Sequence, residues 1–244
     1  MPITFRIPQT MQSDLSILNN TIISCRKCDR LIKYCDEISH IKRRMYIDED
    51  YWGKPVPSFG DPAAQILIVG LAPAAHGANR TGRMFTGDRS GLWLFDSLNK
   101  FGFSNNVEPI SVGDGVILSN VYITAMVHCA PPGNKPSKQE IDTCSLYLKQ
   151  EMALLENLKI IVALGRIAFD GYLKSLKAMG YTWDNYDIKP RFGHGSIFRT
   201  PDDKMLIASF HPSQQNTQTG RLTKDMFDGV FRKVCQELDN NIPG

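Results

Sequence analysis

Four short runs of apolar residues recur along the chain and predict the strands of a sheet. They cover Gln65–Gly70, Val116–Ala125, Leu158–Gly165 and Lys204–Phe210. The runs are rich in β-branched and aliphatic residues and nearly continuous in their apolar character. Strands of this kind are buried on both faces, as in a parallel sheet that helices cover on each side.

The segments between these runs show the periodicity of helices. The clearest one begins at Ser137, which with Glu140 has the spacing of a capping box, and runs to Asn157. Three more helices are expected, at Ser90–Lys100, Arg166–Met179 and Leu222–Leu238. The alternation of strands and helices predicts a three-layer α/β/α fold with a central, mainly parallel four-stranded sheet.

The length of 244 residues and the hydrophobic content of 42% suit one large α/β domain. We therefore expect a single domain over residues 1–244, with an N-terminal helical segment at about residues 10–50. The stretch Asp50–Pro62, rich in proline and glycine, reads as an irregular connector into the core.

Polar loops follow three of the predicted strands. They are Gly70–Asp88 after the first, Cys129–Asn134 after the second and His211–Gln215 after the last. In open parallel sheets the ligand site lies at the carboxyl ends of the strands. We expect these three loops to converge on one site at that edge.

Charge and hydropathy narrow the class of protein. With 28 basic and 25 acidic residues the net charge is +3, which does not by itself require a polyanionic partner. No apolar stretch approaches the roughly 18 to 20 residues of a membrane span, and the first residues do not resemble a signal peptide. A soluble, cytoplasmic protein is expected.

Six cysteines in a reducing compartment favour a metal or redox site over disulfides. Cys25 and Cys28 form a C-x-x-C pair near the end of an N-terminal helix, and Cys129 and Cys144 bracket the loop that follows the second strand. The four thiols predict one tetrathiolate site, and their spacing leaves both zinc and an iron–sulfur cluster open. Two cysteines are expected to be small, partly buried apolar side chains, namely Cys35 and Cys235.

Four motifs together resemble the uracil-DNA glycosylase superfamily and, within it, family 5, the type B iron–sulfur enzymes of bacteria and archaea. The resemblance extends from about Cys25 to the last helix. Ser58 and Ala78 depart from it, because glycine is usual at both positions. The motifs are Gly70–Gly77, Asn79–Gly91, Cys129–Pro136 and His211–Asn216.

The resemblance implies a structural [4Fe–4S] cluster with Cys25, Cys28, Cys129 and Cys144 as its ligands. Such a cluster ties the N-terminal helix to the loop after the second strand and holds Asn134 near the base pocket. The implied partner is double-stranded DNA that contains uracil or another deaminated base. A monomer is expected, and no membrane partner.

A glycosylase extrudes a base from the duplex and breaks the bond between base and sugar, so negative charge develops on the departing uracil. His211 is the first candidate donor to a uracil oxygen, and Asn134 can match the uracil edge, although Gly-Asn is also a common turn. Phe85 offers a face for stacking, with an ordinary core position as the alternative. The expected substrate-binding set is Gly70, Leu71, Ala72, Pro73, Ala74, Ala75, His76, Phe85 and Ser213, with backbone N–H groups of the Leu71–Ala75 turn as donors.

The attacking water needs a group to orient it, and the turn after the first strand offers no acid–base side chain. The resemblance supports Asp88 as the group that orients water or stabilises the sugar cation, and an N-cap of the following helix is the alternative reading. His76 is a weaker candidate for assisting in this step. The small Ala74 predicts a pocket with room beside C5, and therefore action on hypoxanthine, xanthine or C5-modified uracils as well as on uracil.

DNA binding requires contacts to phosphate, and six basic residues lie in or beside the site loops. About half of them are expected to touch phosphate: Arg80, Arg83, Arg89, Lys135, Lys138 and Arg221. Gln214, Gln215 and Leu222 are candidates for a wedge that fills the gap in the duplex, and Leu222 has the alternative of facing the core.

Two other functions stay open at this level. One is a non-catalytic iron–sulfur module that binds DNA or transfers electrons. The other is a zinc-dependent nucleotide hydrolase, although the sequence lacks a G-x-x-x-x-G-K-[ST] phosphate loop.

Overall fold

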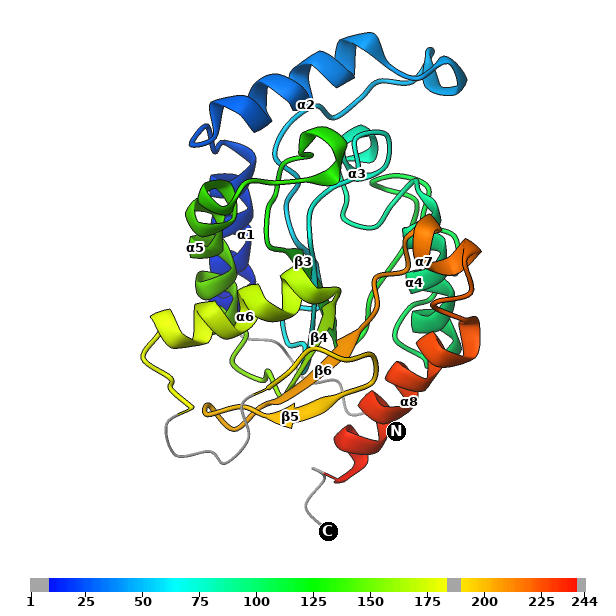
Figure 1. Ribbon diagram of the computed structural model, residues 1–244. Coiled ribbons are helices and arrows are strands. Elements are labelled where there is room, and N and C mark those ends of the chain that lie inside the picture. Colours follow the sequence, from blue (N-terminus) through cyan, green and yellow to red (C-terminus); the bar gives the residue numbers. More distant parts are fainter. Residues whose placement is uncertain (1–8, 184–189, 241–244) are drawn as a thin grey trace.

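Six strands form a single mixed sheet in the computed structural model, which describes residues 9–183 and 190–240. Their order across the sheet is β1-β3-β2-β4-β6-β5, and helices lie against both faces (Figure 1). The strands are β1 (Phe59–Gly60), β2 (Ile66–Gly70), β3 (Val121–Ala125), β4 (Ile160–Leu164), β5 (Ile197–Arg199) and β6 (Met205–Ser209).

The four central strands are parallel, as the sequence predicts. In the register, Ile68 lies between Ile123 of β3 and Val162 of β4, and Val162 in turn pairs with Ile207 of β6. The prediction of four strands is wrong at the edges of the sheet, where β1 and β5 pair antiparallel with β3 and β6. These edge strands have only 2 and 3 residues, too few to give a recognisable periodic pattern.

The second strand is shorter than the apolar run that predicts it. The run starts at Val116, whereas β3 starts at Val121, and Ile117 is 63% exposed. Asn120 interrupts the run with a φ of 60°, and its side-chain oxygen accepts a hydrogen bond from the backbone N–H of Gln65 at 2.8 Å. A left-handed residue cannot continue a strand, so regular pairing begins only after it.

Alternate residues of the central strands feed two separate cores. Helices α4 (Arg89–Lys100) and α8 (Lys224–Asn240) cover one face, and α5 (Lys138–Leu154) and α6 (Arg166–Ala178) cover the other, with α1 (Gln9–Ile23) packed on α5 (Figure 1). Ile66, Ile68, Ile160, Val162 and Ile207 lie in the first core, and Leu67, Val69, Ile161, Ala163 and Leu206 lie in the second. This confirms the predicted three-layer α/β/α architecture.

The N-terminal helical segment continues past α1 over the carboxyl ends of the strands. There α2 (Asp29–Ile41) lies beside α3 (Ala78–Thr81), and a short 3₁₀ turn, η1 (Arg44–Tyr46), follows α2 (Figure 1). The remaining short helices are η2 (Pro132–Asn134) and α7 (Gln214–Gln218). Both belong to the loops that the sequence predicts at the site.

The local signals for helix ends are largely confirmed. Ser137 Oγ accepts the backbone N–H of Glu140 at 3.2 Å, and the Glu140 carboxylate accepts the backbone N–H of Ser137 at 2.7 Å, which completes the capping box of α5. The last helix starts at Lys224 rather than at Leu222. Within residues 9–183 and 190–240, no helix has both the length and the apolar character that a bilayer crossing requires.

Candidate functional site

A cavity of about 530 Å³ opens at the carboxyl ends of β4 and β6, and two of the three predicted site loops contribute to it. No residue of the Cys129–Asn134 loop lines it. Leu71 from the loop after β2, Gly165 after β4 and His211 after β6 all line it. Parallel strands end at one edge of the sheet, and this geometry brings together residues that are far apart in the sequence.

His211 lies in this cavity as a neutral imidazole. Burial lowers its pKa to about 4, so at neutral pH one ring nitrogen carries a proton and the other accepts. The backbone of His211 is held in place because Asn216 Nδ2 donates a hydrogen bond to the His211 carbonyl oxygen at 2.9 Å. A neutral histidine of this kind is a hydrogen-bond donor that brings no charge of its own.

The ring of Phe85 stacks beside His211, with centroids 6.0 Å apart and an interplanar angle of 29°. Phe85 has a φ of 52°, an unusual conformation for a bulky residue. Two glycines make room for it: a Cβ on Gly70 would meet the Phe85 ring at 2.9 Å, and one on Gly91 would meet its carbonyl oxygen at 2.0 Å. The glycines of the motif therefore fix the Phe85 ring at the end of β2.

The turn that follows β2 presents backbone donors. The carbonyl of Ala74 accepts the backbone N–H groups of Gly77 and Asn79, both at 3.1 Å. The backbone N–H groups of Ala72, Ala74 and Ala75 donate to no acceptor within the described residues. Such a turn can direct dipoles at an oxygen that develops negative charge.

Asp88 is the N-cap of α4, which confirms the structural alternative for this residue. Its Oδ1 accepts the backbone N–H of Gly91 at 2.8 Å. Its Oδ2 faces Gly77, where a Cβ would approach to 2.5 Å. Burial raises the pKa of the Asp88 carboxyl above its usual range, while the hydrogen bonds from backbone N–H groups oppose that shift. The carboxyl thus lies against the predicted substrate loop, and its role towards water stays a prediction.

His76 is bound to a residue that the sequence analysis did not identify. Its Nδ1 lies 3.0 Å from Tyr51 Oη, and the backbone N–H of Arg43 donates to the same hydroxyl at 3.3 Å. Burial lowers the pKa of His76, and the positive charges of Arg43 and Arg80 lower it further. Tyr51 sits in the irregular connector, and nothing in the sequence points to its contact with His76.

Asn134 has the conformation of a turn residue. Its φ is 57° and that of Gly133 is 61°, and the Asn134 side chain is exposed. Asn134 does not line the cavity around His211. The structure agrees with the alternative that Gly-Asn forms a turn, and contact with a base stays a prediction.

The structure corrects the assignment of two arginines to phosphate binding. Arg80 is 8% exposed, donates to the carbonyls of His76 at 2.9 Å and Gly87 at 3.1 Å, and pairs with Glu49. Arg83 is 7% exposed and donates to both carboxylate oxygens of Asp114, at 2.8 and 2.6 Å. Both guanidinium groups are occupied in shaping the first motif loop, so they are not free to reach DNA.

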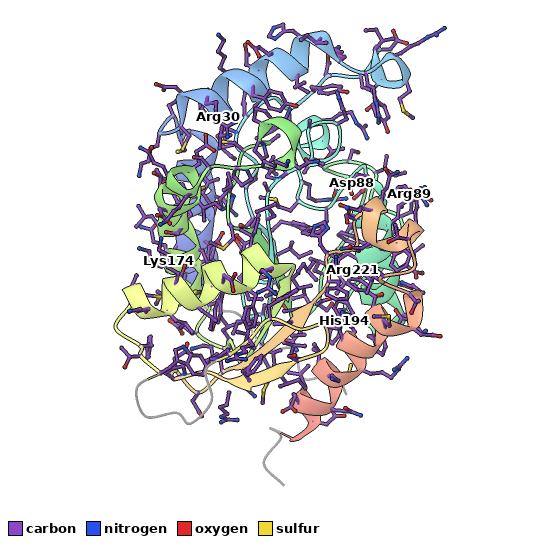
Figure 2. All side chains as sticks on the ribbon, viewed as in Figure 1. Arg30, Asp88, Arg89, Lys174, His194 and Arg221 are labelled. Carbon is purple, nitrogen blue, oxygen red and sulfur yellow. The ribbon has the colours of Figure 1, made fainter. Side chains whose placement is uncertain are left out.

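Leu222 is fully buried in the core beneath α8, which contradicts its assignment as a wedge. A wedge must project into the duplex, whereas Leu222 packs with Phe227 and Phe231. The other DNA-contact candidates are exposed: Arg89, Lys135, Lys138, Gln214, Gln215 and Arg221. Figure 2 shows Asp88, Arg89 and Arg221 on the side of the molecule where α7 lies.

The sequence analysis assigned no role to three large side chains that line the cavity, those of Arg166, Phe192 and Phe210. The guanidinium of Arg166 lies 5.1 Å from the Phe192 ring centre, and that of Arg221 lies 4.7 Å from the Phe210 ring centre. Arg166 begins α6 directly after β4, so the strand-end rule could have found it. Asn216 is the last residue of the His211–Asn216 motif and Phe210 directly precedes it, whereas Phe192 lies in an irregular segment without a sequence signal.

The predicted ligand cysteines gather in one apolar cluster, and all six cysteines of the chain are free. Cys129 and Cys144 are buried there, and Cys25 and Cys28 pack against them from the link between α1 and α2. Cys35 is also buried in this cluster, and Cys235 is partly buried against the α8 core, as expected.

Among the described residues, no three His, Cys, Asp or Glu side chains converge closely enough to hold a metal ion. Cys25, Cys28, Cys129 and Cys144 are free thiols around one apolar volume, and four such thiols form a donor set that both zinc and an iron–sulfur cluster accept.

Comparison with known proteins gives one consistent result. Residues 57–235 match the family described as the uracil DNA glycosylase superfamily. The chain is 46% identical over 218 residues to the type-5 uracil-DNA glycosylase of Mycobacterium bovis, covering 89% of this chain and 79% of that protein. It is 44% identical over 216 residues to the type-5 enzyme of Thermus thermophilus, covering 88% and 94%. The type-4 uracil-DNA glycosylase of Pyrobaculum aerophilum is 33% identical over 210 residues, covering 85% and 89%.

Proposed function

This chain belongs to the uracil DNA glycosylase superfamily, and on that basis we propose that it is a uracil-DNA glycosylase of the type-5 group. It binds double-stranded DNA as a monomer and hydrolyses the N-glycosidic bond of a uracil that is flipped out of the duplex. The observation that carries this proposal is the neutral His211, which lines a cavity at the carboxyl edge of the sheet and stacks beside Phe85.

The chemistry follows from where charge develops. As the bond to the sugar breaks, the uracil leaves as an anion, and positive charge builds on the sugar. A neutral His211 donates a hydrogen bond to a uracil oxygen, and the N–H groups of Ala72, Ala74 and Ala75 supply further donors. These dipoles are fixed before the substrate arrives, so little reorganisation is needed as the charge develops.

Asp88 acts on the sugar side of the reaction in this proposal. Its carboxyl lies against Gly77 of the substrate loop, where it orients the attacking water or stabilises the sugar cation. Asn134 contacts the edge of the base from the η2 turn. The exposed positions of Arg89, Lys135 and Arg221 suit contacts to DNA phosphates.

We propose that the pocket accepts more than uracil. The cavity of about 530 Å³ that His211 lines can hold hypoxanthine, xanthine or a C5-modified uracil. Ala74 does not line this cavity, and its small side chain adds no bulk to the first motif loop. Matched duplexes that carry each base test this proposal. Cleavage of uracil alone would contradict it.

Cys25, Cys28, Cys129 and Cys144 hold a [4Fe–4S] cluster in this proposal. When bound, the cluster supplies a structural cross-link between the N-terminal helices and the loop after β3. The non-catalytic DNA-binding or redox module is not favoured, because the type-5 relatives that the chain matches over most of its length are named as glycosylases.

The proposal is tested by single-turnover excision of uracil from a duplex with a U·G pair. His211→Ala removes the donor, and the rate constant should fall about 10²- to 10³-fold, as for the loss of an oxyanion-hole donor. If the unmodified protein binds the duplex but leaves its uracil intact, the assignment as an enzyme is contradicted.

Asp88 needs a matched pair of variants, because it also caps α4. Asp88→Asn keeps a good N-cap but removes the charge, whereas Asp88→Ala removes both and costs about 1 kcal/mol of stability. We expect both variants to lose excision by at least about tenfold and only Asp88→Ala to lose stability. If Asp88→Asn keeps full excision activity, the carboxylate has no role in the reaction and Asp88 serves only as the N-cap of α4.

A further inference from the structure

Residues 42–47, here called the basic loop, form an exposed segment directly after α2. Lys42, Arg43 and Arg44 are followed by Met45, which is 67% exposed. No carboxylate among the described residues is ion-paired with any of the three basic side chains. Two more apolar side chains stand out beside Met45: Ile41, which is 70% exposed, and Ile47, which is 54% exposed.

The basic loop is fastened to the first motif loop through several contacts. The Arg80 guanidinium lies 3.8 Å from the centre of the Tyr46 ring, and Arg80 also pairs with Glu49. The backbone N–H of Arg43 donates to Tyr51 Oη, which is itself bound to His76. The segment therefore has a fixed position relative to the proposed site, while its charged and apolar side chains face solvent.

The position of the basic loop suits an extended partner. In Figure 1 the loop follows α2 at the top of the molecule, above α3 and on the side of α7. Figure 2 shows Asp88 and Arg89 below it on that same side. A duplex that reaches the site edge extends well beyond the flipped nucleotide, so it can meet more of the surface than the strand-end loops.

We infer that the basic loop is a second DNA-contact surface, in which Arg43 and Arg44 bind phosphates of the duplex and Met45 packs against the sugar edges of a groove. Unpaired cations and an exposed apolar side chain are the combination that binds backbone and groove together. The inference rests on the proposed function for its partner, duplex DNA. Glu49 is neutralised by Arg80, and the exposed Asp48 and Asp50 end the basic stretch.

The test measures binding of the full chain to a duplex without uracil over a range of salt concentrations. Each phosphate contact contributes about 0.9 to the slope of log affinity against log salt. The double variant Arg43→Ala/Arg44→Ala should lower that slope by about 1.8 and weaken binding about tenfold or more in moderate salt. Met45→Ala should weaken binding a few-fold and leave the slope unchanged.

The control is the charge-matched variant Lys174→Ala/Lys177→Ala on α6. Both lysines are exposed, and Figure 2 shows Lys174 far from Asp88. Unchanged affinity and slope in the Arg43/Arg44 variant would overturn the inference, as would an equal change in the control. A slower excision step with unchanged binding would also overturn it, because the loop would then act only through Tyr51 and His76.

The two proposals fail in different ways. If the unmodified protein binds duplex but does not excise uracil, and the slope still falls in the Arg43/Arg44 variant, the assignment as a glycosylase fails and the second DNA-contact surface stands. If the unmodified protein excises uracil normally and the slope does not change in the Arg43/Arg44 variant, the assignment as a glycosylase stands and the second DNA-contact surface fails.

Discussion

Glu151 has a fully buried carboxyl and lies on α5, one of the two helices that cover the second face of the sheet. Its Oε1 is bound by Ser58 Oγ, which also lies 2.9 Å from Thr124 Oγ1, and its Oε2 has no partner among the described residues. Ser58 stands where the resemblance leads one to expect glycine, so this departure supplies a hydrogen-bond partner for a buried acid. Burial raises the pKa of Glu151 to about 7, and the hydrogen bonds from Ser58 and Thr124 oppose the shift.

This acid should make stability depend on pH. The folded-state pKa of about 7 lies above the ordinary value of 4.5, so the folded state favours the protonated carboxyl. The stability that this preference provides is present below about pH 4.5 and is lost as the pH rises to about 7. Glu151→Gln, which stays neutral, should be more stable than the unmodified protein by about 1 to 3 kcal/mol at pH 8, and no more stable at pH 4.5.

Urea unfolding of the two proteins at both pH values measures this difference. Glu156→Gln changes an exposed glutamate of the same region and serves as the control, with no pH-dependent difference expected. A loss of stability in Glu151→Gln at pH 8 would show that the charged carboxylate is the form that the fold needs.

Between elements, one ion pair joins the first motif loop to the loop that precedes β3. Arg83 of the first motif loop binds Asp114, which also accepts the backbone N–H groups of Ile110 at 2.8 Å and Val116 at 3.1 Å. The two side chains are 8% and 9% exposed. Burial by itself would raise the pKa of Asp114, but the hydrogen bonds from Arg83 and the backbone hold it well below its usual range.

Removing Arg83 should be costly because it leaves a buried carboxylate without its partner. Arg83→Met should lower the free energy of unfolding by about 3 to 5 kcal/mol. The contribution of the pair is present above the usual pKa of an aspartate and is lost as the pH falls below that value, so the difference between the two proteins should shrink in acid.

Chemical denaturation at pH 7 and at pH 3 checks this expectation. Lys174→Ala is the control, because it breaks an exposed pair with Asp142 and should change stability by less than about 1 kcal/mol. Equal effects of the two variants would contradict the assignment of Arg83 as the residue that fixes the two loops.

At the scale of the whole molecule, the four thiols connect parts of the chain that are distant in sequence. Cys25 and Cys28 lie between α1 and α2, Cys129 follows β3, and Cys144 lies on α5. A cluster at these thiols would hold the N-terminal helices over the carboxyl edge of the sheet, where α2 and the basic loop meet the first motif loop.

If the proposed [4Fe–4S] cluster is bound at these thiols, removal of its iron by a chelator should loosen the N-terminal helices before the sheet. Limited proteolysis should cut near residues 42–57 faster in the iron-free protein, while the core from β2 to α8 is cut no faster. Cys144→Ser should behave like the chelated protein, whereas Cys235→Ser should retain the brown colour and the original cleavage pattern. The same cleavage pattern with and without iron would contradict a structural role for the cluster.

Features of this protein that depend on local pattern could be predicted from the order of its residues. The apolar runs gave the four parallel strands, Ser137 and Glu140 gave the start of α5, and the strand-end rule placed His211 and the first motif loop at one edge. These features could be predicted because periodicity, capping and chain direction act between residues that are close in sequence.

Which polar and apolar side chains are available for binding follows only from how the chain packs. Arg80 and Arg83 look free in the sequence, but their carboxylate partners come from distant segments. For Leu222 the sequence leaves a wedge and a core position open, and packing against α8 decides for the core. The contact of Tyr51 with His76 and the edge strands β1 and β5 likewise arise only once the chain is packed. Burial and ion pairing depend on which residues meet in space, and no local pattern records that.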